Sequence, residues 1–209
     1  NKRSLAYNPE LYEVAVQGIA MKARWLARKL RQVAEGVLVA IDEPYLCSFG
    51  SAFVNVPRND VIAAIDGAVT AIHKEGALAG LHCCGNTDWS LVLATDVDVI
   101  NFDAWEFSQG LSLYPAELIS FLEKGGTLSW GIIPASRAND NLDPRALLDT
   151  LDRRIQPFVA KGMDRALLYR QALLTPTCGL GTETEERAEG AVDALVELSS
   201  LVREREGPQ

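Results

Sequence analysis

The chain has 209 residues and a formal net charge of -8, a size at which one domain can bury a substantial core. Its 48% hydrophobic and 23% charged residues are typical of a globular protein. The acidic balance argues against a nucleic-acid partner, because phosphate binding requires clustered Lys and Arg, and no apolar run reaches the roughly 18 residues of a membrane span.

The cysteines favour a reducing, cytoplasmic compartment. Four are present, two of them adjacent, which is sparse for a disulfide-stabilised secreted scaffold. Asn1-Lys2-Arg3 does not lead into the apolar core of a signal peptide. The chain also begins without Met and almost directly in a helical pattern, which indicates a piece of a longer protein.

Strand and helix patterns alternate along the chain. Helices are predicted over residues 9–36, 59–75, 88–94, 115–123, 143–162 and a terminal segment that opens with the capping box Thr182-Glu183-Thr184-Glu185. Strands are predicted over residues 37–41, 77–84, 97–102, 127–133 and 166–174. The first strand is continuously apolar, which is typical of a parallel strand buried on both faces. The charged end of the terminal helix, from Arg203 onward, is expected to fray.

Five strands, each followed by a helix, predict a parallel sheet with right-handed crossovers. Both a doubly wound open sheet and a (β/α)8 barrel have this order. Polar residues follow the ends of four strands: Asp42 and Glu43, His82 and Cys84, Asp103, and Cys178. We favour the barrel, because it brings all strand ends together on one face, where active sites are built, whereas an open sheet spreads them along a line.

The stretch Leu81-His82-Cys83-Cys84-Gly85-Asn86 has the pattern of half a metal site. Side chains alternate along a strand, so His82 and Cys84 share one face and Cys83 lies on the other, in the core. Imidazole and thiolate are ligands that zinc prefers, and Cys178 supplies a third. The fourth position is then a carboxylate or is open for substrate, as in catalytic zinc sites.

Other residues of the same types have simpler interpretations. We expect Cys47, in a loop, to be structural and His73, on a helix, to be solvated or satisfied by a local partner. For the tryptophans at positions 89, 105 and 130, a core or rim role is favoured over stacking on a flat methyl donor.

The order of four motifs resembles the catalytic domain of cobalamin-independent methionine synthase. The motifs are Ile41-Asp42-Glu43-Pro44, Leu81-His82-Cys83-Cys84-Gly85-Asn86, Asp96-Val97-Asp98-Val99-Ile100 and Pro176-Thr177-Cys178-Gly179-Leu180. That family belongs with uroporphyrinogen decarboxylase and the zinc methyltransferases that act with corrinoid proteins. The resemblance covers roughly residues 9 to 200.

The resemblance implies a (β/α)8 barrel in which His82, Cys84 and Cys178 bind zinc. The family's next ligand is a glutamate, and this chain has Asp103 at that position, with Glu106 as the alternative. The resemblance further implies that Asp42 holds the amino group of a homocysteine-like substrate and that Glu43 supports it as a catalytic residue. Asn86 is expected to contact the substrate.

A barrel of this family has three further strands before the first one here, carrying the residues that hold the methyl donor. We therefore expect residues 1–209 to form one catalytic barrel domain that holds the last five strands and lacks the N-terminal ones. The donor, a methylfolate or a methylcorrinoid on a partner protein, stays open.

The predicted function is zinc-dependent methyl transfer to a thiol. Coordination to zinc deprotonates a thiol that is mostly protonated at neutral pH, and so makes it a nucleophile. Two alternatives stay open. One is a metal-free decarboxylase of the uroporphyrinogen type, and the other is a non-catalytic module that binds zinc and a thiol or corrinoid.

Overall fold

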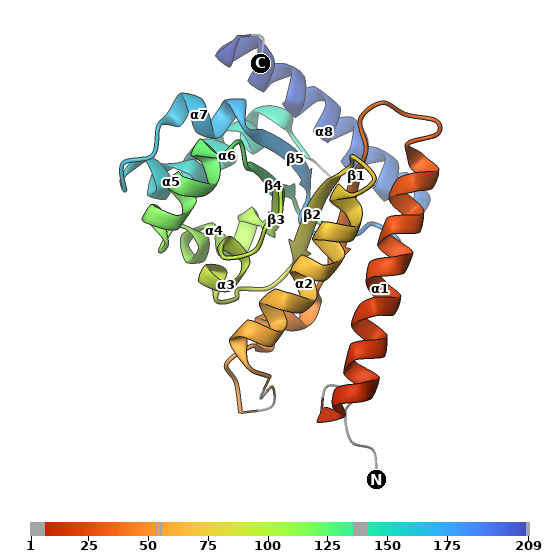
Figure 1. The fold of residues 1–209 in the computed structure, drawn as a ribbon. Coiled ribbons are helices and arrows are strands. Elements are labelled where there is room, and N and C mark those ends of the chain that lie inside the picture. Colours follow the sequence, from red (N-terminus) through yellow and green to blue (C-terminus); the bar gives the residue numbers. More distant parts are fainter. Residues whose placement is uncertain (1–6, 53, 55, 136–141, 208–209) are drawn as a thin grey trace.

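A parallel five-stranded sheet forms the centre of the protein. The computed structural model describes residues 7–52, 54, 56–135 and 142–207. The strands are β1 (Leu38–Asp42), β2 (Leu78–Cys83), β3 (Val99–Asp103), β4 (Thr127–Ile133) and β5 (Ala172–Pro176). They lie in the order β1-β2-β3-β4-β5, and every neighbouring pair is parallel (Figure 1). The sequence order has no reversal of the kind found at the switch point of a doubly wound sheet.

Helices connect the strands and flank the sheet, which makes this an α/β fold (Figure 1). They are α1 (Pro9–Leu30), the short 3-10 helix η2 (Pro44–Ser48), α2 (Arg58–His73), α3 (Trp89–Leu93), α4 (Ala104–Leu111), α5 (Pro115–Glu123), α6 (Pro144–Val159), α7 (Arg165–Arg170) and α8 (Glu185–Glu206). Within the described ranges, no helix is both long enough and apolar enough to cross a membrane.

The helix starts show why several boundaries could be predicted. Asn8 caps α1, where its side chain accepts a hydrogen bond from the backbone N–H of Leu11 (3.2 Å) and Pro9 occupies the first helical position. Asp143 caps α6 in the same way, next to Pro144. Both predicted starts are confirmed.

Two elements in the second half of the chain differ from prediction. The predicted strand 166–174 is divided into the helix α7 and the strand β5, because Asp164 caps a helix by accepting from the N–H of Ala166 (2.9 Å). The helix α4 was not predicted at all. It begins directly after β3, with Asp103 as its cap.

The terminal helix α8 also differs from prediction at both ends. Thr184, and not Thr182, is its cap, accepting from the N–H of Arg187. The predicted fraying from Arg203 is wrong, because α8 continues to Glu206 and Arg205 forms an ion pair with Asp152 of α6 (2.6 Å).

One face of the sheet is packed against the helices. Leu81, Ile100 and Trp130 point to this face and are fully buried. A row of aromatic rings extends across it from α3 to α6, joining Trp89, Phe102, Trp130 and Phe158 at centroid distances of 5.0 to 6.0 Å. The core role predicted for two of the tryptophans, those at positions 89 and 130, is confirmed.

On the opposite face of the sheet the described residues leave parts of β1, β2 and β5 uncovered, whereas Val99, Ser129 and Ile133 of β3 and β4 are buried. Leu38, Leu78 and Leu173 on β1, β2 and β5 keep 42%, 53% and 43% of their surface exposed. The prediction that the first strand is buried on both faces is therefore wrong, since β1 alternates between exposed and buried positions. We call this surface the open face, and the candidate site lies at the rim where the strands end.

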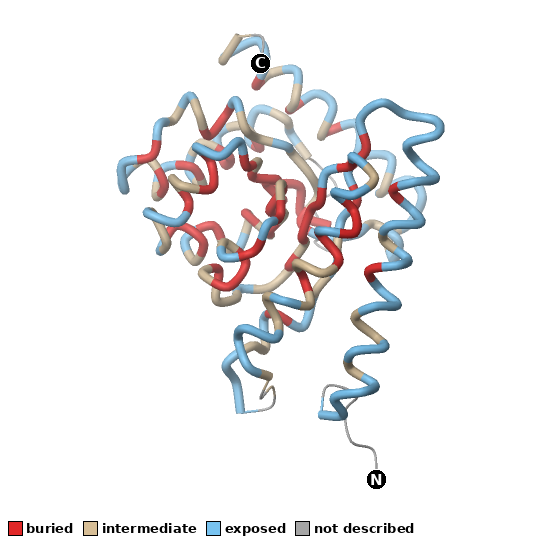
Figure 2. Tube along the Cα trace, in the orientation of Figure 1, coloured by how far each residue is buried: buried red, intermediate tan, exposed pale blue. Residues whose placement is uncertain are grey.

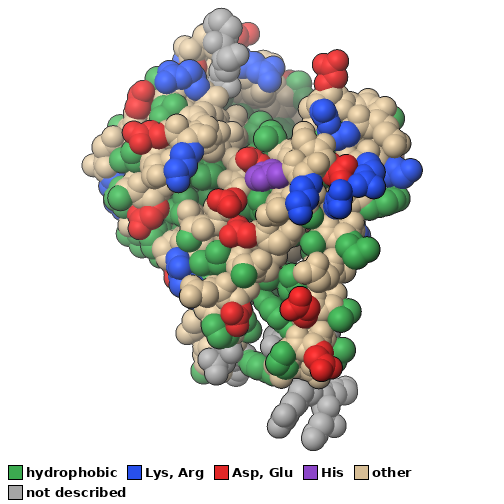
Figure 3. All heavy atoms as spheres, viewed as in Figure 1, with side chains coloured by type: hydrophobic (Ala, Val, Ile, Leu, Met, Phe, Trp, Pro, Cys, Tyr) green, Lys and Arg blue, Asp and Glu red, His purple; other side chains and the backbone are tan. Residues whose placement is uncertain are grey.

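The helix α1 also carries exposed apolar side chains. Figure 2 shows it exposed along most of its length, with few buried positions. Val14, Met21 and Trp25 are 59 to 71% exposed, and hydrophobic side chains lie between charged ones across the face shown in Figure 3. The open face and α1 together leave apolar surface of a kind that soluble domains usually cover.

Candidate metal centre

His82 lies near the carboxyl end of β2, and Cys84 follows directly after the strand. Because side chains alternate along a strand, Cys83 points to the opposite face and is fully buried in the core, as predicted. Burial raises the pKa of Cys83 to about 11, so this thiol stays protonated at neutral pH. His82 and Cys84 are half-buried at the rim of the open face.

The loop after β5 brings Cys178 to the same rim. The backbone of Thr177 donates to the carbonyl of Ile133 on β4 (2.8 Å), and its hydroxyl accepts from the N–H of Ala135 (3.0 Å). Gly131 of β4 makes this close approach possible, because a Cβ there would lie 2.9 Å from the Cα of Thr177. The position of Cys178 therefore depends on a glycine in the neighbouring strand.

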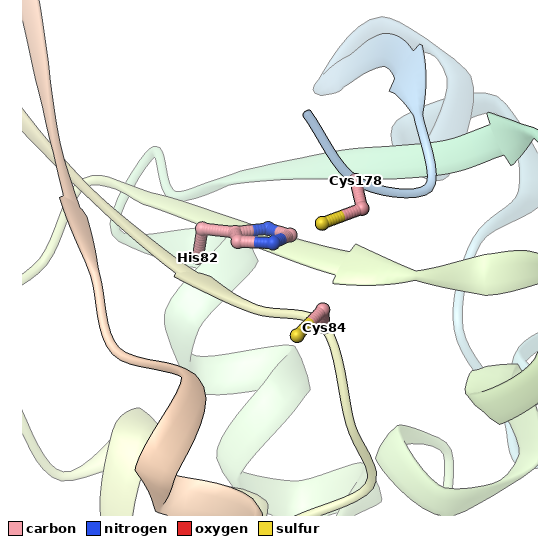
Figure 4. A group of neighbouring side chains, drawn as sticks. All are labelled: His82, Cys84 and Cys178. Carbon is pink, nitrogen blue, oxygen red and sulfur yellow. The ribbon is translucent and has the colours of Figure 1, made fainter. Parts of the chain in front are cut away.

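His82, Cys84 and Cys178 come together at this rim. One ligand atom from each lies within 4.8 Å of the others. Figure 4 shows the three side chains converging from β2 and from the loop after β5, with the sulfur of Cys178 pointing toward the imidazole ring. Three of the four residues predicted to bind metal thus form one group.

Burial and nearby groups both act on the thiol of Cys84. The pKa of Cys84 is raised, first by burial and then by the negative charges of a Cys178 thiolate and the Asp42 carboxylate, which would repel a thiolate at position 84. A positive ion between the two sulfurs would reverse this effect, because opposite charge stabilises the thiolate form.

The two residues predicted as a fourth ligand, Asp103 and Glu106, lie outside the group of three. Asp103 caps α4, and its carboxylate accepts from the N–H of Glu106 (2.9 Å). Asp103 is half-buried and Glu106 is exposed, and neither belongs to the group within 4.8 Å. Coordination by either residue stays a prediction.

The predicted substrate residues follow β1 and β2. Asp42 is in register with His82 and is exposed, and the N–H of Glu43 donates to the carbonyl of His82 (2.9 Å). Burial, and to a smaller extent Asp42, raise the pKa of Glu43 above its ordinary value. Asn86 lies against Gly110 of α4, where a larger residue would meet its side chain.

The short helix η2 lies over the loop that carries Cys84. The hydroxyl of Thr87 donates to the carbonyl of Leu46 (2.7 Å), and a Cβ on Gly85 would lie 2.7 Å from the Cβ of Cys47. Cys47 itself is exposed, and its thiol donates to the carbonyl of Pro44 (2.9 Å). This packing fits the structural role predicted for Cys47.

Two contacts concern histidines. His73 lies 2.7 Å from a carboxylate oxygen of Asp98, which confirms that it has a local partner.

His82 forms a hydrogen bond through Nδ1 with the side chain of Asn101 on β3. Asn101 was missed by sequence reasoning, because one amide within an apolar strand has no spacing pattern that marks it.

The surroundings of the four thiols predict their order of alkylation. In metal-free protein, iodoacetamide should modify the exposed Cys47 and Cys178 first and the buried, high-pKa Cys83 last, as measured by peptide mass spectrometry. Added zinc should protect Cys84 and Cys178 and leave Cys47 reactive. Equal rates at Cys47 and Cys178 in the presence of zinc would contradict metal binding by this group.

Comparison with models of known protein families and with curated proteins finds no match to this chain.

Proposed function

We propose that this chain carries the metal and thiol site of an enzyme that transfers a methyl group to a homocysteine-like thiol, with a methylfolate or methylcorrinoid as donor. The observation that carries the proposal is the convergence of His82, Cys84 and Cys178 within 4.8 Å at the carboxyl ends of parallel strands. The order of motifs similar to cobalamin-independent methionine synthase supports the same function.

The geometry of the three ligands suits zinc. Bond lengths of about 2.0–2.1 Å to nitrogen and 2.3 Å to sulfur place ligand atoms about 3.5–3.8 Å apart in a tetrahedron. Ligand atoms within 4.8 Å of one another reach that spacing by small side-chain rotations. One nitrogen and two sulfurs leave a fourth position, which a thiol substrate or a carboxylate such as Asp103 would occupy.

The residues around the site have separate roles in this proposal. Zinc held by the three ligands would lower the pKa of a substrate thiol and keep it nucleophilic at neutral pH. Asp42, exposed beside His82 on the adjacent strand, would bind the substrate's amino group by charge. Glu43 would support Asp42 from a more buried position.

We also propose that the sheet belongs to a (β/α)8 barrel. Sequential parallel strands with helices packed on one face are the arrangement of such a barrel. Three further strands between β5 and β1 would cover Leu38, Leu78 and Leu173 on the open face, and their helices would cover the exposed side of α1. The methyl donor would bind to that additional part.

Metal content and zinc X-ray absorption test this function. We expect one zinc per chain in protein purified without chelators, with a first shell of one nitrogen and two sulfurs. Homocysteine should add a third sulfur to that shell. Protein without zinc that binds none when zinc is added would exclude the proposal and favour the decarboxylase alternative.

Methyl transfer is measured separately, with methylfolate and with methylcobalamin as donors. Methionine formation from either donor supports the enzyme. Zinc and thiol binding without transfer from either donor, in protein supplied with the rest of the barrel, would favour the non-catalytic module.

A further inference from the structure

Asn101 lies at the centre of a polar network on the open face. It is in register with His82 of β2 on one side and with Ser129 of β4 on the other. Its amide nitrogen Nδ2 lies 3.1 Å from the carbonyl oxygen of Ser129, 2.8 Å from the Ser129 hydroxyl and 2.8 Å from the hydroxyl of Thr175 on β5. Its amide oxygen Oδ1 contacts Nδ1 of His82.

These contacts determine which way the amide faces. A backbone carbonyl can only accept a hydrogen bond, so the group of Asn101 that faces Ser129 O must be the NH2. Oδ1 then faces His82, and since Oδ1 can only accept, Nδ1 of His82 must carry the proton. In the neutral ring this leaves the lone pair on Nε2.

We propose that Asn101 is a positioning residue that holds His82 in the Nδ1–H tautomer and makes Nε2 the metal-binding atom. Histidine ligands in metal sites commonly donate their second ring N–H to an acceptor that sets tautomer and ring orientation. Here the acceptor is a neutral amide, which adds no negative charge to a site that already contains two thiols. The metal-binding part of this inference rests on the proposed function, and the tautomer does not.

The hydroxyls of Ser129 and Thr175 connect Asn101 to β4 and β5. Their hydroxyls lie 3.5 Å apart and both contact the Asn101 amide. Thr175 belongs to β5, three residues before Cys178. The network therefore joins the strand that carries His82 to the strand that leads to Cys178, through β3 and β4.

The second histidine provides an internal reference. Nε2 of His73 contacts a carboxylate oxygen of Asp98 at 2.7 Å, so a neutral His73 must carry its proton on Nε2. The chain has two histidines. Their ring signals should therefore report opposite tautomers in one spectrum.

Long-range proton–nitrogen correlation NMR of metal-free protein with 15N-labelled histidine tests the tautomer directly. At a pH where both rings are neutral, we expect Nδ1–H for His82 and Nε2–H for His73. Asn101→Leu should shift His82 toward Nε2–H and leave His73 unchanged. An Nε2–H tautomer for His82 in the unaltered protein would overturn the inference, whether or not the variant folds.

Zinc affinity is the second measurement, by competition with a chromophoric chelator. Asn101→Leu should weaken binding by about 10- to 100-fold, the usual effect of losing such a partner. Gln171→Leu is the matched control, since its amide also donates to backbone carbonyls, at Leu122 (3.0 Å) and Gly126 (2.8 Å), in a different part of the fold. Gln171→Leu should leave zinc affinity and both tautomers unchanged.

The two measurements separate this inference from the proposed function. A folded Asn101→Leu protein with the zinc affinity and His82 tautomer of the original chain would overturn the role of Asn101. If the original chain binds no zinc but its His82 is in the Nδ1–H tautomer and loses it in Asn101→Leu, the positioning role stands and the proposed function fails.

Discussion

Replacing both Cys84 and Cys178 with serine is expected to abolish zinc binding and, with it, methyl transfer. The two thiols are the sulfur members of the group that lies within 4.8 Å, and a serine hydroxyl stays protonated where a thiol would ionise. Each single variant should lose more affinity than the roughly 10- to 100-fold that loss of an outer hydrogen-bond partner costs. Elemental analysis and chelator competition measure both effects.

Cys47→Ser is the control for this pair. It makes the same chemical change at an exposed thiol near the site but outside the group of three. Zinc content should therefore stay at one per chain. Stoichiometric zinc in the double variant would mean that the metal is held elsewhere, and the assignment of these two cysteines would be wrong.

Gly131→Ala should reduce both stability and zinc affinity. A Cβ at this position would lie 2.7 Å from the carbonyl oxygen of Phe102, 2.9 Å from the Cα of Thr177 and 3.2 Å from the carbonyl oxygen of Pro176. These are backbone atoms of β3, of β5 and of the loop after β5, so the segments on both sides of β4 would have to move, and the shift on the β5 side would carry Cys178 with it. Overpacking of this kind costs about 1–3 kcal/mol, measured as the free energy of unfolding in urea.

Gly80→Ala tests whether any alanine in the sheet has this effect. A Cβ on Gly80 of β2 would lie 3.4 Å from the end of the Leu38 side chain and 3.7 Å from Ala40, which is ordinary contact. We expect a change in the free energy of unfolding within about 1 kcal/mol, the range for Gly→Ala where alanine can adopt the backbone conformation without strain. If Gly131→Ala is equally mild, the close approach of β5 does not control the position of Cys178.

The part of the site that could be predicted is the part with a local pattern. His82 and Cys84 are two apart in the predicted strand 77–84, so alternation predicted a shared face, and the two side chains do converge although Cys84 lies just after β2. Cys178 could be added because it follows the last strand and parallel strands end at one edge. The burial of Cys83 follows from the same alternation.

What could not be predicted depends on contacts between distant segments. Asn101 acts through partners on three other strands, and no spacing in the sequence joins it to Ser129 or Thr175. The strand predicted over residues 166–174 illustrates a different limit. A short apolar run fits a helix and a strand equally well. Here the side chain of Asp164 accepts a hydrogen bond from the N–H of Ala166 and so stabilises a helix that extends to Arg170.

The wrong expectation for the first strand has a physical cause of another kind. An apolar run such as Val37–Ile41 correctly predicts a strand, but burial on both faces requires a second layer. In the described part of the chain only the helix-covered face has one. Periodicity can therefore identify the strand without identifying what packs on it.

The separation of Cys84 from Cys178 has a mechanical consequence for the sheet. The two sulfurs belong to segments that follow β2 and β5, with β3 and β4 between them. An ion bound to both would act as a crosslink that closes a chain segment containing β3, β4, β5 and several helices, and it would limit how far the sheet can flatten. Loss of zinc should then be measurable as faster amide hydrogen exchange in β5, an edge strand that pairs with β4 alone among the described strands.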